Sequence, residues 1–377
     1  MRHVTAAVCR DDKSPLLFER LTLEDPRPDE LIIEVAYCGI CHTDISAVQG
    51  KMGSLKPVVL GHEGAGVVVQ VGADVKSVRP GDRVMMTNMT CGECPQCLGG
   101  APAYCRHARP LNMNAERLDH STAFHASEVH SHFFGQSSFA TYSLANKRNV
   151  VKVPDDIPLS SAAALGCGVM TGTSAVFNAA DVRPGGAVLV TGTGAVGLSA
   201  VMAARICGAS CIIGVDIVPS RLDLARQLGA THTYLATDPD LPAKIREASG
   251  GGINYAIEAS GNVKALAPAL DSLAQQGSVV IVGAAGLVDG TFRWRDLQLR
   301  GATIRGSVIG DANPPIFMPR LFQYYREGRF PVERLIKLYD FEAINEAMHD
   351  AEAGGTIKPV LRIGEADQPN TAVGSSI

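Results

Sequence analysis

Four of the ten cysteines in this chain fall within fifteen residues. Cys91, Cys94, Cys97 and Cys105 have the spacing C-x2-C-x2-C-x7-C. Four thiolates on a short loop can close a tetrahedral shell around zinc, which is typical of a structural site with no open position. A nucleic-acid-binding zinc ribbon uses similar ligands, but the flanking sequence is not basic. The spacing therefore predicts a structural zinc in a lobe over about residues 88–110.

Two earlier segments carry further candidate ligands at predicted turns. They read CGICHTD at 38–44 and GHEG at 61–64. Cys38 and Cys41 have the spacing of a redox-active pair, but the strand and helix of a thioredoxin-like fold do not follow them. A single histidine such as His62 is more often a hydrogen-bonded structural residue than a ligand. From the residues alone, both interpretations of these segments stay open.

A later stretch contains His120, His125, His130 and His132. A second histidine metal site is one interpretation. A loop facing solvent or a substrate cleft is favoured, because the spacing fits no single helix face.

A glycine-rich turn predicts a dinucleotide site. Residues 191–197 read TGTGAVG, and they lie between the apolar run 187–190 and a segment of small residues that ends near Cys207. Strand, turn and helix in this order let the glycine backbone approach a pyrophosphate, whose charge meets the free N–H groups of the helix N-terminus. The residues expected to contact the cofactor here are Gly192, Gly194, Val196 and Gly197.

The choice of cofactor depends on an acid at the end of the next apolar run. Asp216 lies 19 residues beyond Gly197. A carboxylate at this point accepts hydrogen bonds from the adenosine ribose and repels a 2′-phosphate, which predicts NAD rather than NADP. Arg221 weakens this prediction of NAD, because its guanidinium can contact the ribose or partly restore binding of the 2′-phosphate of NADP.

The elements around these motifs indicate two domains. The first 80 residues contain valine- and isoleucine-rich runs bounded by turn residues, which predicts a small β-barrel-like unit. From residue 187 strands and helices alternate, which predicts a parallel sheet wound with helices on both faces, an α/β fold. We expect a β-rich unit over 1–168 and 309–377 and a dinucleotide-binding unit over 169–308.

Composition places the chain among ordinary globular proteins. The chain has 377 residues, 34 basic and 38 acidic side chains, a net charge of −4 and 46% hydrophobic residues. Without a strongly basic block, a nucleic-acid or membrane surface is not indicated, and small molecules are the expected partners. The N-terminus lacks the pattern of a signal peptide, so we expect a cytoplasmic protein whose cysteines serve metals or catalysis.

Taken together, the chain resembles the zinc-dependent medium-chain alcohol dehydrogenase family over about residues 4–363. The resemblance is carried by GICHTD at 39–44, GHEGAG at 61–66, the four cysteines, LGCG at 165–168, the glycine turn and Val215-Asp216. The segment HFFGQSSFA at 132–140 is similar to the aryl-alcohol (benzyl-alcohol) dehydrogenase branch. The resemblance implies a GroES-like β-barrel catalytic domain beside a Rossmann domain, two zinc ions per chain, and a homodimer or homotetramer.

The resemblance also implies roles for individual residues. Cys41, His62 and Cys167 would hold a catalytic zinc with one position left for substrate. Thr43 matches the hydroxyl that takes the alcohol proton, and Asp44 matches the carboxylate that orients the zinc histidine. Glu63 resembles a glutamate that approaches the metal in this family. The alternative is that Glu63 forms a buried ion pair with a basic residue.

Three further positions concern the cofactor and the proton path. His42 occupies a position often held by an arginine beside the pyrophosphate; a phosphate contact is favoured over proton relay, and both are possible in one residue. Lys358 is implied to contact the pyrophosphate. Ser46 stands where the best-known animal enzymes have the histidine that ends the proton relay, which leaves the exit of the proton open.

The expected activity is reversible oxidation of primary alcohols, aromatic or allylic ones such as benzyl alcohol, to aldehydes with hydride transfer to NAD. An aliphatic or S-(hydroxymethyl)glutathione-type alcohol dehydrogenase is the alternative within the same class. A non-catalytic nucleotide-binding structural protein is the alternative from another class, and the presence of Cys41, His62 and Cys167 together argues against it.

Overall fold

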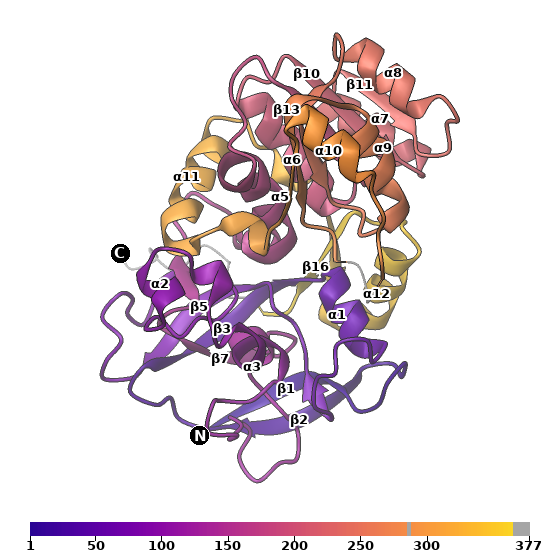
Figure 1. The fold of residues 1–377 in the computed structure, drawn as a ribbon. Helices are drawn as coiled ribbons and strands as arrows, with labels where there is room; N and C mark the ends of the chain where they lie inside the picture. The colour runs from indigo at the N-terminus through magenta and orange to yellow at the C-terminus, as the bar shows by residue number, and fades with distance from the viewer. Residues whose placement is uncertain (285–287, 365–377) are drawn as a thin grey trace, which may run out of the picture. The chain divides into compact units, whose positions relative to one another are not determined.

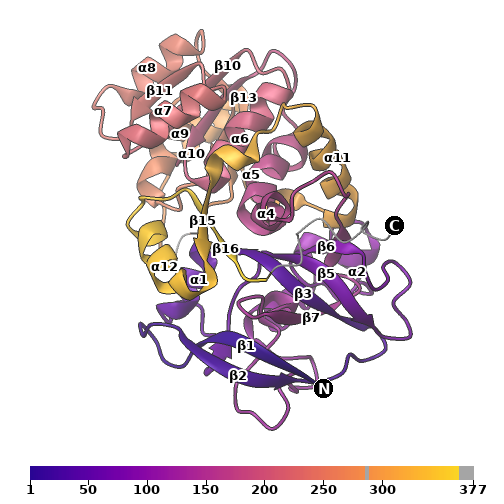
Figure 2. The same cartoon turned by 180° about the vertical axis from the view of Figure 1, so that it is seen from behind.

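The computed structural model describes residues 1–284 and 288–364. The chain divides into two compact units. Unit 1 comprises Met1–Gly99, Cys105–Cys167 and Glu333–Ile377, and unit 2 comprises Gly100–Tyr104 and Gly168–Val332. Figures 1 and 2 give the elements of each unit from opposite sides.

Unit 1 is built from two sheets around one hydrophobic core. The smaller sheet has the order β2-β1-β4, and the larger sheet has the order β15-β16-β3-β5-β6-β8, with β7 also paired to β3. Apart from the parallel pair β15 and β16, neighbouring strands are antiparallel. The strands are β1 (Arg2–Cys9), β2 (Leu17–Leu23), β3 (Glu30–Gly39), β4 (Val58–Val59), β5 (Gly64–Val71), β6 (Arg83–Met86), β7 (Tyr142–Asn146), β8 (Val150–Lys152), β15 (Ile336–Asp340) and β16 (Lys358–Arg362).

Short helices complete unit 1, and some of them contain candidate site residues. They are α1 (His42–Val48), α2 (Pro95–Leu98), α3 (Ala108–Met113), α4 (Leu159–Ala164) and α12 (Ile344–Glu352). The long central strand β3 ends at Gly39, and Ile40 and Cys41 connect it to α1. Because β3 pairs with β5 through Cys38 and Gly64, the residues that follow β3 lie close to those that precede β5.

Unit 2 is one parallel six-stranded sheet with the order β11-β10-β9-β12-β13-β14. The parallel sheet with helices between its strands, expected from the alternating pattern, is confirmed. The strands are β9 (Ala187–Thr191), β10 (Cys211–Asp216), β11 (His232–Leu235), β12 (Ile253–Glu258), β13 (Leu273–Ile281) and β14 (Thr303–Gly306). Every residue of β9 and β10 is buried, as expected for strands covered on both faces.

Most of the helices of unit 2 pack on this sheet. The helices of this unit are α5 (Met170–Ser174), α6 (Ala195–Ile206), α7 (Pro219–Leu228), α8 (Leu241–Ala248), α9 (Leu266–Asp271), α10 (Trp294–Arg300) and α11 (Pro314–Arg326). The helix α6 contacts β9, β10 and α7, and α8 contacts α9. The glycine turn directly follows the carboxyl end of β9, next to the point between β9 and β12 where the strand order reverses.

The second domain boundary corrects the sequence prediction. We expected the chain to return to the catalytic unit at residue 309, and the structure places the return at Glu333. The intervening residues stay with unit 2 because they pack on its helices. The ring of Phe177 stacks on Tyr324 with centroids 5.5 Å apart, and Oγ of Ser174 donates to the carbonyl of Gly310 at 2.8 Å.

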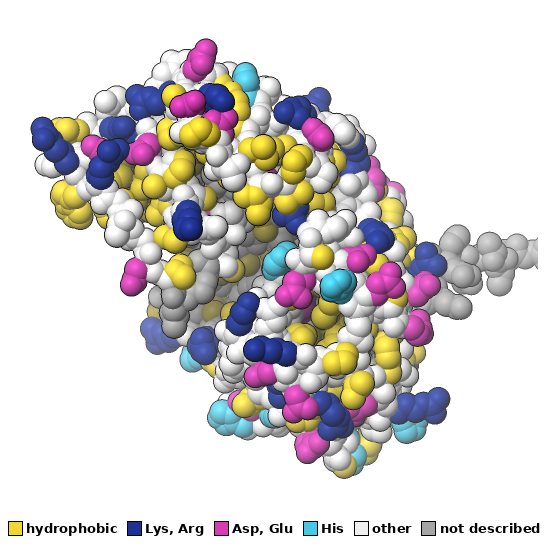
Figure 3. Space-filling model, turned by 90° about the vertical axis from the view of Figure 1, so that its right-hand side faces the viewer, with side chains coloured by type: hydrophobic (Ala, Val, Ile, Leu, Met, Phe, Trp, Pro, Cys, Tyr) yellow, Lys and Arg dark blue, Asp and Glu magenta, His cyan; other side chains and the backbone are white. Residues whose placement is uncertain are grey.

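One helical stretch of the described chain, Leu159–Ala179, is long and apolar enough to cross a membrane by length and composition. However, 89% of its most apolar window is buried inside the protein, as in a core helix. On the face in Figure 3, the described basic and acidic side chains are interspersed, so this face has no large field of one sign.

Candidate functional site

Three turns of unit 1 bring Cys41, His62 and Cys167 together. Cys41 is the N-cap residue of α1, and His62 lies just before β5. Cys167 lies in the π-helical turn Leu165–Val169, which follows α4. Such turns inside helices are frequent at functional sites, because they change the direction in which a side chain leaves the helix.

These residues form a potential metal site. The donor atoms of Cys41, His62, Glu63 and Cys167 all lie within 4.8 Å of one another. Nε2 of His62 is buried and has no hydrogen-bond partner within the described chain. A buried polar atom in that state is available to bind a ligand such as a metal ion. Two thiolates and one imidazole are a donor set for zinc that leaves a position open, so the residues fit a catalytic zinc.

The two thiols of this site affect each other's pKa. Hydrogen bonding to Cys167 lowers the pKa of the Cys41 thiol well below its usual value, and the same contact raises the pKa of Cys167. Zinc binds cysteine as the thiolate, so metal binding releases thiol protons and the metal affinity depends on pH.

Asp44 connects the two segments that carry Cys41 and His62. Its Oδ1 lies 2.9 Å from Nδ1 of His62 and also accepts the N–H of Gly61 at 3.1 Å. Its Oδ2 accepts the N–H of Cys41 at 3.0 Å. The carboxylate is fully buried. A carboxylate at Nδ1 fixes the tautomer and orientation of a ligating histidine and leaves Nε2 as the donor atom.

Glu63 and Lys358 form a buried ion pair at the same site. Burial raises the pKa of Glu63 to about 7, although the ammonium of Lys358 favours the carboxylate. Lys358 also donates to the carbonyl of Ile40 at 3.4 Å. A Cβ at Gly39 would lie 2.1 Å from Oε2 of Glu63, so this carboxylate needs a glycine beside it. The alternative interpretation of Glu63 as an ion-pair residue matches this geometry, whereas the phosphate contact of Lys358 stays a prediction.

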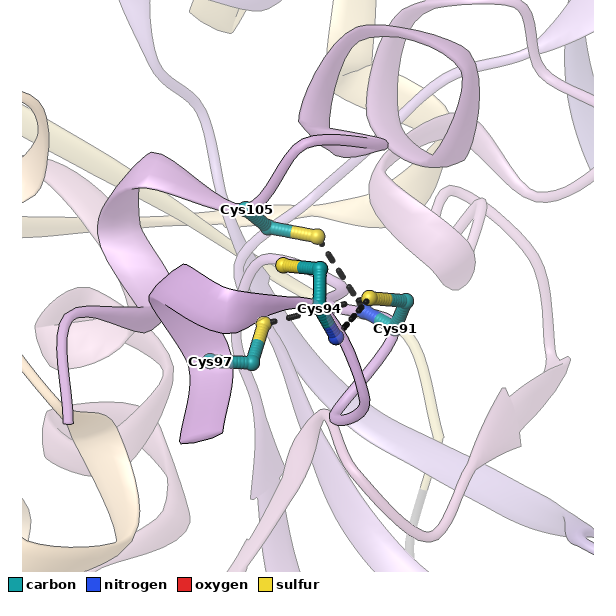
Figure 4. Close-up of side chains that lie close together, drawn as sticks. All are labelled: Cys91, Cys94, Cys97 and Cys105. Carbon is teal, nitrogen blue, oxygen red and sulfur yellow. Dashed lines mark hydrogen bonds between the residues drawn. The ribbon is translucent and has the colours of Figure 1, made fainter. Parts of the chain in front are cut away.

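The four cysteines of the lobe also converge on one another (Figure 4). Their sulfur atoms accept backbone N–H groups, as zinc thiolates do: Cys91 donates to Cys105 at 3.3 Å, and Cys94 donates to Cys91 at 3.4 Å. The N–H of Arg106, donating to Sγ of Cys94, lowers the pKa of that thiol to about 6. All ten cysteines of the chain are free of disulfides. This cluster fits a closed structural zinc site.

An aromatic ring lies against the imidazole of the first site, which the sequence patterns did not predict. The ring of Phe134 stacks on His62 with centroids 4.5 Å apart and an interplanar angle of 28°. Phe134 is half-buried and has φ = 53°, a left-handed conformation that costs about 1–3 kcal/mol for a bulky residue. The only sequence signal was the likeness of 132–140 to the aryl branch.

Neighbouring side chains hold this strained segment in place. Gln136 donates to the carbonyls of His62 and Thr87 and accepts the N–H of Gly64, so it ties the segment to the metal-site turn. Asn149 donates to the carbonyl of Gly135 at 3.0 Å. These hydrogen bonds anchor the two residues that follow Phe134, whose ring lies beside His62.

The glycine turn of unit 2 has room for a phosphate. Gly192 has φ = 82°, which favours glycine, and a Cβ at Gly197 would lie 1.8 Å from the carbonyl oxygen of Gly192. A Cβ at Gly194, the N-cap residue of α6, would meet nothing within 4 Å. The three glycines thus serve the tight turn, the close packing of the helix and an open approach to its N-terminus. The turn fits a dinucleotide pyrophosphate.

The other predicted cofactor residues lie in several places. Asp216 ends β10 and is buried, and Arg221 lies in the first turn of α7 with Nε buried and without a hydrogen-bond partner in the described chain. Val196 lies in the first turn of α6, and His42 is exposed at the start of α1. The contacts of all four with a cofactor stay predictions.

The histidine-rich stretch forms no potential metal group within the described residues. His132 is buried, with Nε2 3.7 Å from Glu30, and Glu30 makes a bidentate pair with Arg117 at 2.7 and 3.0 Å. His120 is exposed and lies 2.7 Å from Glu116. The expected cleft loop is thus partly a buried ion-pair network, which the spacing of the histidines could not reveal.

Comparison with known proteins agrees with the fold and the donor sets. A model of the alcohol dehydrogenase GroES-like domain matches residues 27–155, and a model of zinc-binding dehydrogenases matches residues 195–323. The chain belongs to the zinc-dependent medium-chain alcohol dehydrogenase family, a family of oxidoreductases. The predicted GroES-like and Rossmann architecture is confirmed.

Individual relatives cover nearly the whole chain. Geraniol dehydrogenase from Castellaniella defragrans is 40% identical over 94% of this chain and 96% of its own. The crystal structure of benzyl alcohol dehydrogenase from Acinetobacter calcoaceticus is 40% identical, with a TM-score of 0.94, and the match covers 97% of this chain and 100% of that one. S-(hydroxymethyl)glutathione dehydrogenase from Saccharomyces cerevisiae is 35% identical over 96% of both chains.

Proposed function

We propose that the protein catalyses reversible oxidation of aromatic or allylic primary alcohols to aldehydes with NAD. The observation that carries the substrate class is the stacking of Phe134 on His62. A rigid ring beside the metal-binding imidazole favours a flat, unsaturated substrate, because ring–ring contacts contribute about 0.5–1.5 kcal/mol beyond buried area. The geraniol and benzyl alcohol dehydrogenases among the relatives support this class.

Several residues of unit 1 have separate roles in the proposed catalysis. When bound by Cys41, His62 and Cys167, zinc supplies a Lewis acid that makes an alcohol more acidic. The hydroxyl of Thr43 takes the proton of the alcohol. Thr43 and Ser46 are half-buried and three residues apart on α1, so they lie on one face of the helix, and Ser46 passes the proton on.

The positioning residues keep this arrangement fixed. Asp44 holds the segments of Cys41 and His62 together and sets the tautomer of the imidazole. Lys358 neutralises Glu63, so the carboxylate adds no uncompensated charge to two thiolates. An excess of negative charge would weaken the metal as a Lewis acid.

NAD accepts the hydride in this proposal. The glycine turn binds its pyrophosphate, with His42 as a further phosphate contact, and Asp216 accepts hydrogen bonds from its adenosine ribose. We also assign a second, structural zinc to the four-cysteine cluster, a homodimeric or homotetrameric assembly, and a cytoplasmic location in which the thiolates stay reduced.

A substrate panel tests the proposal. Benzyl, cinnamyl and geranyl-type alcohols, short aliphatic alcohols and S-(hydroxymethyl)glutathione are each offered with NAD and with NADP, and reduced nicotinamide is followed by absorbance. We expect the aromatic and allylic alcohols with NAD to have the highest kcat/KM. A higher kcat/KM for ethanol or for the glutathione adduct would refute the substrate class, and absence of turnover with every alcohol by the zinc-loaded protein would favour a structural protein.

A further inference from the structure

The turn that receives the pyrophosphate and the acid that receives the ribose are joined by one side chain. The backbone N–H of Thr193 donates to Oδ2 of Asp216 at 2.6 Å, and its hydroxyl lies 3.0 Å from the same oxygen. Thr193 is the second residue of the sequence GTG in the glycine turn and is fully buried. A hydroxyl that donates to a carboxylate forms a charge-assisted hydrogen bond, the stronger kind.

The geometry fixes both ends of Asp216. Oδ1 accepts the N–H of Val218 at 2.9 Å, so the carboxylate receives hydrogen bonds on both oxygens. On the other side of Thr193, its methyl carbon lies 3.4 Å from where a Cβ of Gly214 would be, within β10. The threonine thus packs its methyl group on the strand that carries Asp216 and directs its hydroxyl at the carboxylate.

We infer that Thr193 is a positioning residue that sets the preference for NAD over NADP. This inference rests on the proposed NAD-dependent function. The ribose of NAD donates hydrogen bonds from its hydroxyls, whereas NADP presents a 2′-phosphate that a carboxylate repels. Both effects depend on a carboxylate that is held in one orientation. The donors to its two oxygens set that orientation, and the hydroxyl of Thr193 is a side-chain donor among them.

Removal of that hydroxyl leaves Asp216 with backbone donors only. The carboxylate then loses an anchor on Oδ2 and can rotate away from the ribose. Arg221 is unchanged in such a variant and can still attract a phosphate. Binding of NAD is therefore expected to weaken more than binding of NADP, so the ratio of the two affinities falls.

Two substitutions separate the hydroxyl from the methyl group. Thr193→Val keeps the shape of the side chain and removes the hydroxyl, whereas Thr193→Ser keeps the hydroxyl and removes the methyl group. Thr191→Val is the matched control. Thr191 is also buried, two residues earlier, and within the described chain its hydroxyl has no hydrogen-bond partner.

Fluorescence titration of the zinc-loaded proteins with NADH and with NADPH measures the four pairs of dissociation constants without turnover. In Thr193→Val we expect the Kd for NADH to rise about tenfold, the size of one charge-assisted hydrogen bond, and the Kd for NADPH to change less than about threefold. Thr193→Ser and Thr191→Val should keep the wild-type ratio.

Two outcomes overturn the inference and are distinguishable from failure of the proposed function. If the wild-type protein prefers NADH and Thr193→Val has the same ratio, Thr193 does not set selectivity. The same conclusion follows if Thr191→Val or Thr193→Ser lowers the ratio as much as Thr193→Val does. If the wild-type protein itself binds NADPH more tightly, the proposed NAD dependence fails, whatever the variants do.

Discussion

Oδ1 of Asp44 lies 2.9 Å from Nδ1 of His62, and no protein group of the described chain bonds the other nitrogen of that imidazole. The same carboxylate accepts the N–H of Cys41. Asp44 therefore holds two of the three proposed zinc ligands in position.

Replacement of this carboxylate should loosen the catalytic metal. In Asp44→Asn, an amide N–H₂ group must face either the N–H of Cys41 or the ring of His62, and the charge that supports the imidazole is lost. We expect catalytic zinc affinity to fall about 10–100-fold, measured by competition with a chelator followed by metal analysis. Asp155→Asn, at an exposed position, is the control. Equal zinc retention in the two variants would contradict the role of Asp44.

Phe134→Leu should change substrate preference. The substitution keeps an apolar side chain and removes the ring that stacks on His62. We expect kcat/KM for benzyl alcohol to fall roughly fivefold, equivalent to about 1 kcal/mol of ring contact, with little change for ethanol. Phe292→Leu, an exposed ring of unit 2, is the control. A parallel loss for benzyl alcohol and ethanol would mean that Phe134 has no part in selectivity.

Glu63 and Lys358 should depend on each other for stability. Removal of one partner leaves a buried charge without compensation, which costs about 3–5 kcal/mol, whereas removal of both charges costs much less. We therefore expect Glu63→Gln and Lys358→Met each to lower the free energy of unfolding in urea by this amount, and the double variant to lose less than either single variant. Additive losses in the double variant would argue against direct pairing.

Glu30 should contribute to stability only above acid pH. Although burial opposes its charge, contacts with His132 and Arg117 lower the pKa of Glu30 from its usual 4.5 to about 2. A pKa that is lower in the folded state gives stability that is present above about pH 4.5 and is lost as the pH falls toward 2.

The corresponding measurement compares the wild-type protein with Glu30→Gln in urea at several pH values. The wild-type protein should be the more stable at pH 7, and the two unfolding free energies should converge between about pH 4.5 and 2. A difference that is constant over this range would show that the charge of Glu30 has no part in it.

The sequence predicted those parts of the molecule that follow from local spacing. The four cysteines and the glycine turn each lie within a short stretch, so their convergence needs little knowledge of the fold. Asp216 could be placed because the carboxyl ends of neighbouring parallel strands meet at one edge of a sheet. Only the resemblance to a family assigned Cys41, His62 and Cys167 to one site. Their proximity depends on the pairing of β3 with β5 and on a π-helical turn, which local spacing does not reveal.

Other features depend on side-chain packing that spacing does not encode. The pairing of Glu63 with Lys358 joins residues far apart in the chain. The need for glycine at position 39 comes from the carboxylate of Glu63, so the sequence around position 39 does not explain it. The second boundary was placed too early because residues 309–332 have no sequence signal for the helices on which they pack. The stacking of Phe134 on His62 requires a left-handed backbone that sequence patterns do not predict for phenylalanine.

The central claim is that Cys41, His62 and Cys167 hold a zinc at which alcohol is oxidised. The most direct test measures zinc per chain together with NADH formation from benzyl alcohol, in the wild-type protein and in Cys41→Ala. We predict about two zinc ions in the wild-type protein, in line with its two donor clusters, and about one in Cys41→Ala, which should bind NADH but show no turnover. A single zinc in the active wild-type protein, or turnover by Cys41→Ala, would contradict the account.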